Sequence, residues 1–97
     1  MIHHIVLWNL KEELSPEEKK TAALTIKEKL EAVTEQIEGI ISLEVVINEQ
    51  DSSNKDVGLI SVFESVEALD AYQKHPAHLE AAGYVRSVTC DRACLDY

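Results

Sequence analysis

The chain has 97 residues, and its 18 Asp and Glu outnumber its 9 Lys and Arg to give a formal net charge of −9 at pH 7. This length corresponds to one domain, and the 45% share of apolar residues excludes general disorder. A domain this small buries only about two-thirds of the surface of its unfolded chain, so its core is marginal alone. We therefore expect a single domain over residues 1–97 whose core is supplemented from elsewhere.

Charge and hydropathy exclude several classes of partner. Acidic residues outnumber basic ones in both halves of the sequence, which disfavours contact with nucleic acid phosphates. No apolar run approaches the ~20 residues that span a bilayer, and the N-terminus lacks the pattern of a secretory signal. Two cysteines, Cys90 and Cys94, favour a reducing compartment over a disulfide framework. We expect a cytoplasmic protein that binds neither nucleic acid nor membrane.

Residues 2–10 are predicted to form the first strand, because they are rich in β-branched and aromatic side chains. Side chains alternate between the two faces of a strand, so His4, Val6, Trp8 and Leu10 share one face. The opposite face is also largely apolar, which is unusual for a strand that has water on one side.

The next segment carries the clearest local signal, a helix predicted over residues 16–38. Ser15 can cap its first amides, Pro16 suits the first helical position, and Glu18 completes a capping box. An apolar stripe follows with a spacing of three or four residues, at Ala23, Ile26, Leu30, Val33 and Ile37. Gly39 stands where a left-handed residue would end the helix.

Two further strands are predicted at residues 40–48 and 57–64, joined by a polar loop. In the first of them, alternation predicts one shared face for Ile41, Leu43, Val45 and Ile47.

A second helix should begin after its cap at Ser65 and be interrupted at Pro76, because proline lacks an amide hydrogen and restricts its predecessor. Residues 77–88 are only weakly helical in pattern, and residues 90–97 read as the final strand.

The order strand, helix, strand, strand, helix, strand is the split β-α-β pattern of ferredoxin-like folds. We therefore predict an α+β fold with a four-stranded antiparallel sheet and helices on one face. Because both faces of the strands are apolar, the uncovered face should be an interface. The prediction is a homodimer, a dimeric α+β barrel, in which the sheets of two copies pack face to face.

Histidine and tyrosine side chains are the main chemical feature. Tyr72, His75 and His78 lie near the predicted helix break, and His4 shares a face with Trp8, so these side chains can converge on a cavity between helices and sheet. A histidine there can serve as a general base, and a tyrosine can donate to a developing oxyanion. The alternative for each is structural, and for His75 it is the capping of backbone groups beside Pro76.

Other chemistries have little support. His75 and His78 are spaced i, i+3, and His4 could add a third ligand, but Pro76 disturbs the spacing, so no metal site is expected. On a strand, Cys90 and Cys94 would stand roughly 13 Å apart, too far for a disulfide. Only three glycines are present and no phosphate-binding loop exists, so no cofactor is expected.

Four segments together match the pattern of a known family. They are His4-Ile-Val-Leu in the first strand, the run from Phe63 to Tyr72, His75-Pro-Ala-His78, and the closing Asp96-Tyr97. In these residues the chain resembles the stress-responsive dimeric α+β barrel (Dabb) family over nearly its whole length. The resemblance implies a ferredoxin-like fold whose sheets pair into a barrel between two subunits.

The resemblance also implies candidate roles for residues. In one plant branch, a polyketide cyclase closes a ring by aldol condensation without a cofactor, and its tyrosine and second histidine correspond to Tyr72 and His78. Its first-strand histidine corresponds to His4. By this analogy His78 would be the base and Tyr72 the oxyanion donor. The sequence departs from that branch at Ile26 and Val57, which are apolar where the cyclase pocket is more polar.

Three functional hypotheses follow. The first is a homodimeric barrel that binds a small hydrophobic or aromatic ligand in a pocket lined by Trp8, Phe63, His75 and Ile26. The second is a cyclase-like enzyme of aldol or proton-transfer chemistry that uses His78, Tyr72 and His4. Cofactor-free oxygen chemistry is a further enzymatic option that nothing in the sequence selects. The third is a purely structural or assembly role, with the pocket filled by side chains.

Overall fold

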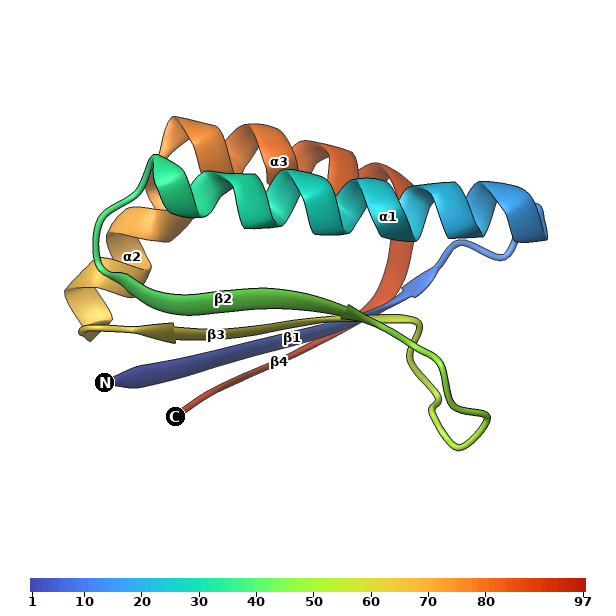
Figure 1. Ribbon diagram of the computed structural model, residues 1–97, viewed down its shortest axis with the longest axis horizontal. Coiled ribbons are helices and arrows are strands. Elements are labelled where there is room, and N and C mark those ends of the chain that lie inside the picture. Colours follow the sequence, from blue (N-terminus) through green and yellow to red (C-terminus); the bar gives the residue numbers. More distant parts are fainter.

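Three helices lie over one face of a four-stranded antiparallel sheet, and the other face is bare (Figure 1). This computed structural model describes all residues 1–97. The elements, in chain order, are β1 (Ile2–Leu10), α1 (Pro16–Ala32), the 3-10 turn η1 (Val33–Glu35), β2 (Ile40–Ile47), β3 (Val57–Phe63), α2 (Val66–Lys74), α3 (Pro76–Val88) and β4 (Thr89–Asp96). The strand order across the sheet is β2-β3-β1-β4. The predicted α+β, ferredoxin-like arrangement is confirmed, with the second helix divided in two.

Helix α1 begins as predicted but ends earlier. The Ser15 hydroxyl accepts from the Glu18 amide at 3.1 Å, and the Ser15 amide donates to the Glu18 carboxylate at 2.8 Å, which completes the capping box. The α-helix stops at Ala32 rather than at residue 38, and the 3-10 turn η1 follows. The Thr34 hydroxyl donates to the Glu31 carbonyl at 2.8 Å, a local bond that competes with continued helix.

Strand β2 contains an irregularity that the simple alternation missed. Its register against β3 shifts between Ile40 and Ser42, which is the mark of a β-bulge. The bulge turns Ile41 outward, where it is 51% exposed, while Val45 is fully buried. The prediction that Ile41 shares a face with Leu43 and Val45 is therefore wrong, because one extra residue inverts the alternation before the bulge.

Pro76 does not leave a weak helix behind it, as the pattern suggested. It occupies the first turn of α3, a regular helix that runs to Val88. His75 ends α2 and begins α3, and its ring Nδ1 accepts a hydrogen bond from the Ala77 amide at 3.0 Å. The proline breaks one helix and, because its fixed φ suits a helix start, initiates the next.

The core lies between the sheet and the helices. It comprises 17 buried apolar residues, and the largest fully buried side chains include Tyr72, Phe63 and Ile26. Strand β1 contributes Val6, Trp8 and Leu10 from the face that looks toward the helices, as its alternation predicted. None of the three α-helices combines the length and the apolar composition that a membrane crossing requires.

The bare face of the sheet is apolar as well. Ile5 on β1 pairs with Ile60 on β3 and Leu95 on β4, and Ile60 and Leu95 are 40% and 60% exposed. The loop of residues 48–56 projects from the sheet on this bare side, away from the helices (Figure 1). A single copy of the chain thus leaves large apolar side chains uncovered on one whole layer.

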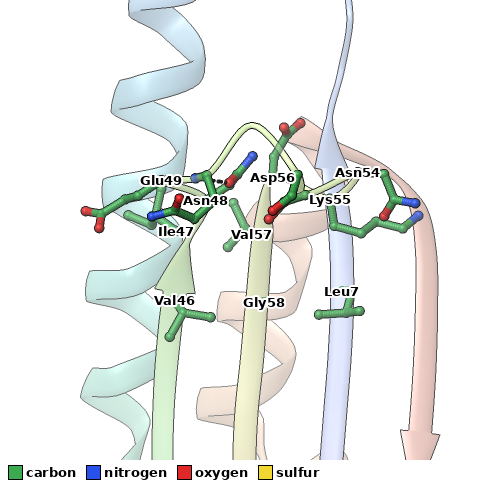
Figure 2. A pocket seen from close by; sticks show the side chains of 13 residues that line it. Leu7, Val46, Ile47, Asn48, Glu49, Asn54, Lys55, Asp56, Val57 and Gly58 are labelled. Atoms are coloured by element: carbon green, nitrogen blue, oxygen red, sulfur yellow. Dashed lines mark hydrogen bonds between the residues drawn. The ribbon is translucent and has the colours of Figure 1, made fainter.

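The loop and the bare face together form a groove of about 530 Å³. Figure 2 shows Val46, Gly58 and Leu7 side by side on β2, β3 and β1 below the loop. A Cβ at Gly58 would stand 3.0 Å from the Leu7 side chain and 3.3 Å from that of Val46, so the glycine allows these two side chains to close over it. The groove is therefore continuous with the apolar bare face.

Two glycines, Gly39 and Gly83, differ in backbone conformation and in the space that a side chain would find, so they give a matched test of the structure. Gly39 has φ +87°, and a Cβ there would come within 2.7 Å of the Ala68 Cβ, whereas a Cβ at Gly83 in α3 meets nothing within 4 Å. We expect Gly39→Ala to lower the free energy of unfolding by about 2 kcal/mol or more. Gly83→Ala should instead raise it by roughly 0.5–1 kcal/mol. Chemical denaturation would measure the free energy of unfolding of both variants. Equal effects would contradict the positive φ and the close packing at Gly39.

Candidate functional site

A cavity of about 260 Å³ opens between the sheet and helix α3. Its apolar wall includes Val6 and Trp8 from β1, Leu59 from β3 and Val85 from α3. Five polar side chains complete the lining: His4, Gln73, His78, Arg86 and Arg92. The cavity is thus an apolar chamber with a few polar groups converging on it, which is the usual construction of a small-molecule site.

Tyr72 and His78 lie against each other beside this cavity. Tyr72 is fully buried on α2, its ring centroid is 4.2 Å from that of His78 on α3, and Phe63 packs beneath it at 4.9 Å. The Tyr72 hydroxyl and the His78 Nδ1 are both buried, and neither has a hydrogen-bond partner. Buried polar groups in native proteins nearly always have partners, so these two unpaired atoms mark Tyr72 and His78 as a candidate site.

Burial sets the protonation of both groups. It raises the pKa of the Tyr72 phenol to about 12, so the phenol keeps its proton and can donate it to a hydrogen bond. Burial, followed by the charges of His4 and Arg86, lowers the pKa of the His78 imidazole below its usual value of 6.5. At pH 7 His78 is therefore neutral and can accept a proton, while Tyr72 can stabilise a developing negative charge.

His4 is held from the other end of the chain. Strands β1 and β4 pair with His4 opposite Asp96, and the His4 Nδ1 is hydrogen-bonded to the Asp96 carboxylate. The Ser61 hydroxyl donates to the His4 carbonyl at 2.8 Å, and Phe63 contacts the His4 ring edge-on. A carboxylate on Nδ1 fixes the orientation of an imidazole ring.

The sequence matches one known protein family over almost its whole length. The sequence profile described as Stress responsive A/B Barrel Domain (Dabb) matches residues 2–97. The chain belongs to the Dabb family. No curated protein matches it at a significant level. The family prediction is thereby confirmed, as is the ferredoxin-like fold by the structures described next.

Several solved structures share the architecture of this Dabb domain. A dimeric protein of unknown function with a ferredoxin-like fold from Bacteroides fragilis is 31% identical with a TM-score of 0.93, and the match covers 99% of this chain and 93% of that one. The protein At3g17210 from Arabidopsis thaliana is 25% identical with a TM-score of 0.76, over 100% and 93% of the two chains. Hydroxynitrile lyase from Passiflora edulis has a TM-score of 0.80 at 17% identity, over 99% and 90%, which shows the fold alone.

The predicted site residues of this Dabb domain fall into two groups. His4, Trp8 and His78 line the cavity, and Tyr72 stands directly behind His78. Phe63 and Ile26 lie in the core with no exposed surface and do not line the cavity.

His75, predicted as a ligand-binding residue, is placed elsewhere. It lines a separate groove between α1 and α3, and its Nδ1 serves the backbone as a cap. The cause is the helix break at Pro76, which turns His75 away from His78. The i, i+3 spacing of the two histidines therefore does not bring them together as metal ligands.

Donor atoms for a metal come together at a different place. The His4 Nδ1, the Cys94 Sγ and an Asp96 carboxylate oxygen all lie within 4.8 Å of one another. A nitrogen, a sulfur and an oxygen form a donor set that borderline ions such as Zn²⁺ accept. Asp96 and Cys94 are exposed, however, and the His4 nitrogen already pairs with Asp96.

Four polar residues that line or support the cavity were not predicted as site residues: Gln73, Arg86, Arg92 and Asp96. Asp96 carried one sequence signal, because it belongs to the closing Asp96-Tyr97 segment of the family pattern. The two arginines carried none, since an isolated arginine in a helix or strand is ordinarily a solvated surface residue.

The lack of a hydrogen-bond partner for the Tyr72 hydroxyl predicts how a substitution there changes stability. Tyr72→Phe removes a buried hydroxyl that has no partner, so the free energy of unfolding should rise by about 1 kcal/mol rather than fall. Tyr97→Phe is the control, because Tyr97 is 62% exposed and its change should be near zero. Urea denaturation would measure both variants. A clear loss of stability in Tyr72→Phe would mean that the hydroxyl has a structural partner.

Proposed function

We propose that residues 1–97 form a single Dabb domain that acts as a homodimer and binds a small apolar or aromatic molecule in the cavity beside Tyr72 and His78. The observation that carries this proposal is the buried hydroxyl of Tyr72 and the buried Nδ1 of His78, which lack partners in the chain. Each unpaired group costs about 1–3 kcal/mol. A ligand that hydrogen-bonds to them would recover this free energy.

The size of the cavity bounds the ligand. A volume of about 260 Å³ lies just below the range of drug-sized sites. Dry cavities of ~150 Å³ already accept benzene. A molecule with one aromatic ring and a short substituent therefore fits, with its apolar part against Trp8, Val6 and Leu59.

The homodimer is supported by the bare face of the sheet. Ile60, Val46 and Leu95 are exposed there, and burial of their side chains against a second copy would add apolar contacts to a core that is small for a single chain. The Bacteroides fragilis relative is described as dimeric. We propose that the two sheets pack face to face, with the loop of residues 48–56 at the edge of the interface.

A cytoplasmic location is part of the same proposal. Both cysteines, Cys90 and Cys94, are free thiols in the structure. Free thiols are typical of a reducing compartment.

A second candidate function, a proton-transfer enzyme of the cyclase type, is favoured by the protonation states of the same two residues. A neutral His78 can remove a proton from a carbon next to a carbonyl, and the protonated Tyr72 can donate a hydrogen bond to the enolate oxygen that forms. His4, held by Asp96, would orient the substrate or return the proton. A purely structural role is less well supported, since it does not account for the unpaired Tyr72 hydroxyl and His78 Nδ1.

Ligand binding can be tested with an intrinsic probe, because Trp8 is the only tryptophan of the chain and lines the cavity. We expect single-ring aromatic compounds to change the fluorescence of Trp8 saturably, and Tyr72→Phe with His78→Gln to weaken their binding. The control is His75→Gln, since His75 lines a different groove. A screen in which no such compound alters Trp8 fluorescence would contradict the proposed function.

The same variants separate a binding protein from an enzyme. If a bound compound is converted, His78→Gln should lower the turnover rate about 10²–10⁴-fold, the usual contribution of a general base. Full turnover by His78→Gln would exclude His78 as that base.

The dimer can be tested by placing a charge on either layer. Ile60→Glu puts a carboxylate in the middle of the bare face, so we expect the variant to be monomeric in size-exclusion chromatography with light scattering. Leu24→Glu is the matched control, because Leu24 is 53% exposed on the helical side and should leave the dimer intact. A wild-type chain that is monomeric at micromolar concentration would refute the homodimer.

A further inference from the structure

Both arginines of the chain line the same cavity. The nine basic residues comprise seven lysines and two arginines, Arg86 on α3 and Arg92 on β4. These two residues lie on either side of the junction between α3 and β4, and both contribute to the wall of the 260 Å³ cavity. None of the seven lysines does so.

The charge of the cavity is opposite to that of the protein. The chain carries 18 acidic residues and a net charge of −9, yet no Asp or Glu lines this cavity. Its two arginines place two positive charges in the lining, and no carboxylate balances them there. A cavity lined by one sign of charge raises the local concentration of ligands of the other sign.

Neither arginine is neutralised within the chain. The three ion pairs of the structure join His4 to Asp96, Lys27 to Glu31 and Lys74 to Asp70, and none includes an arginine. Asp96, which lies on the same strand as Arg92, is paired with His4. The charge of Arg86 reaches into the site, since it contributes to the lowered pKa of His78.

We propose that the ligand of this cavity carries one anionic group, a carboxylate or a phosphate monoester, which Arg86 and Arg92 bind at the cavity mouth while its apolar part contacts Trp8. This inference rests on the proposed function and names the ligand class. Arginine suits the role because its planar guanidinium donates two parallel hydrogen bonds to a carboxylate or phosphate. Both arginines are exposed, so the anionic group would lie at the opening and the apolar body inside.

The positions of the two arginines also determine the orientation of the ligand in the cavity. An anionic group at Arg86 and Arg92 directs the apolar body inward, toward the unpaired couple of Tyr72 and His78. A carbonyl or hydroxyl on that body would then lie against His78, which lines the cavity in front of Tyr72. The ligand would thus be recognised at two points. Its anionic group would bind at the mouth of the cavity, and a neutral polar atom would bind at the buried end.

The experiment compares ligands that differ only in charge. The full chain is titrated with 3-phenylpropanoate, its uncharged amide 3-phenylpropanamide, and 2-phenylethyl phosphate, and Trp8 fluorescence is followed at low salt. We expect at least one of the two anions to bind about tenfold or more tightly than the amide, because hydrogen bonds to charged groups are the strong ones. The tighter of the two anions identifies the anionic group.

Variants assign the preference to the arginines. In the double variant Arg86→Gln with Arg92→Gln, the ratio of anion to amide affinity should fall to about one. Lys20→Gln is the matched control, since it also removes a positive charge but lies on the exposed surface of α1, outside the cavity. Circular dichroism verifies that each variant is folded.

The outcomes separate this inference from the proposed function. An amide that binds as tightly as both anions, or an anion preference that survives in the double variant, overturns the anionic ligand but leaves the proposed binding function standing. Failure of all three probes, together with failure of the wider aromatic screen, overturns both. Loss of the preference in the double variant but not in Lys20→Gln supports the inference.

Discussion

The alternation of side chains along β1 divides this molecule into two working surfaces. Strand β1 is hydrogen-bonded on both edges, to β3 and to β4, so its register is determined twice. His4, Val6 and Trp8 face the helices and form the cavity, while Ile5 and Leu7 face the bare side. Because the period of a strand is two, a slip by one residue would exchange the cavity for the interface. Core, site and bare face all depend on this register.

The site is assembled at a cost in stability. Two buried polar atoms, the Tyr72 hydroxyl and the His78 Nδ1, lack partners in a chain of only 97 residues. A domain of this size has little free energy to spare, since native proteins are stable by roughly 5–15 kcal/mol. Sites that violate the rules of packing in this way are usually functional. Association of two apolar sheet faces would add stability that offsets the cost of the two unpaired atoms.

The order and type of the elements were predictable because local chemistry determines them. The Ser15 capping box, the alternation in β1 and the proline at residue 76 act within a few residues of themselves. The errors occurred where a local rule competes with packing. The end of α1 depends on a 3-10 turn that leads into Gly39, and the outward position of Ile41 depends on a bulge that only its pairing with β3 reveals.

The sequence by itself determined the family, the order of elements and the identity of the residues at the helix break, since motifs and periodicity are properties of short segments. Only the tertiary structure decided which of those residues meet. It placed His78 with Tyr72, separated His75 from them, and joined His4 to Asp96 across 92 residues of chain. It also brought both arginines to one cavity. The physical reason is that burial and proximity arise from strand register and helix packing, which join segments that are far apart in the chain.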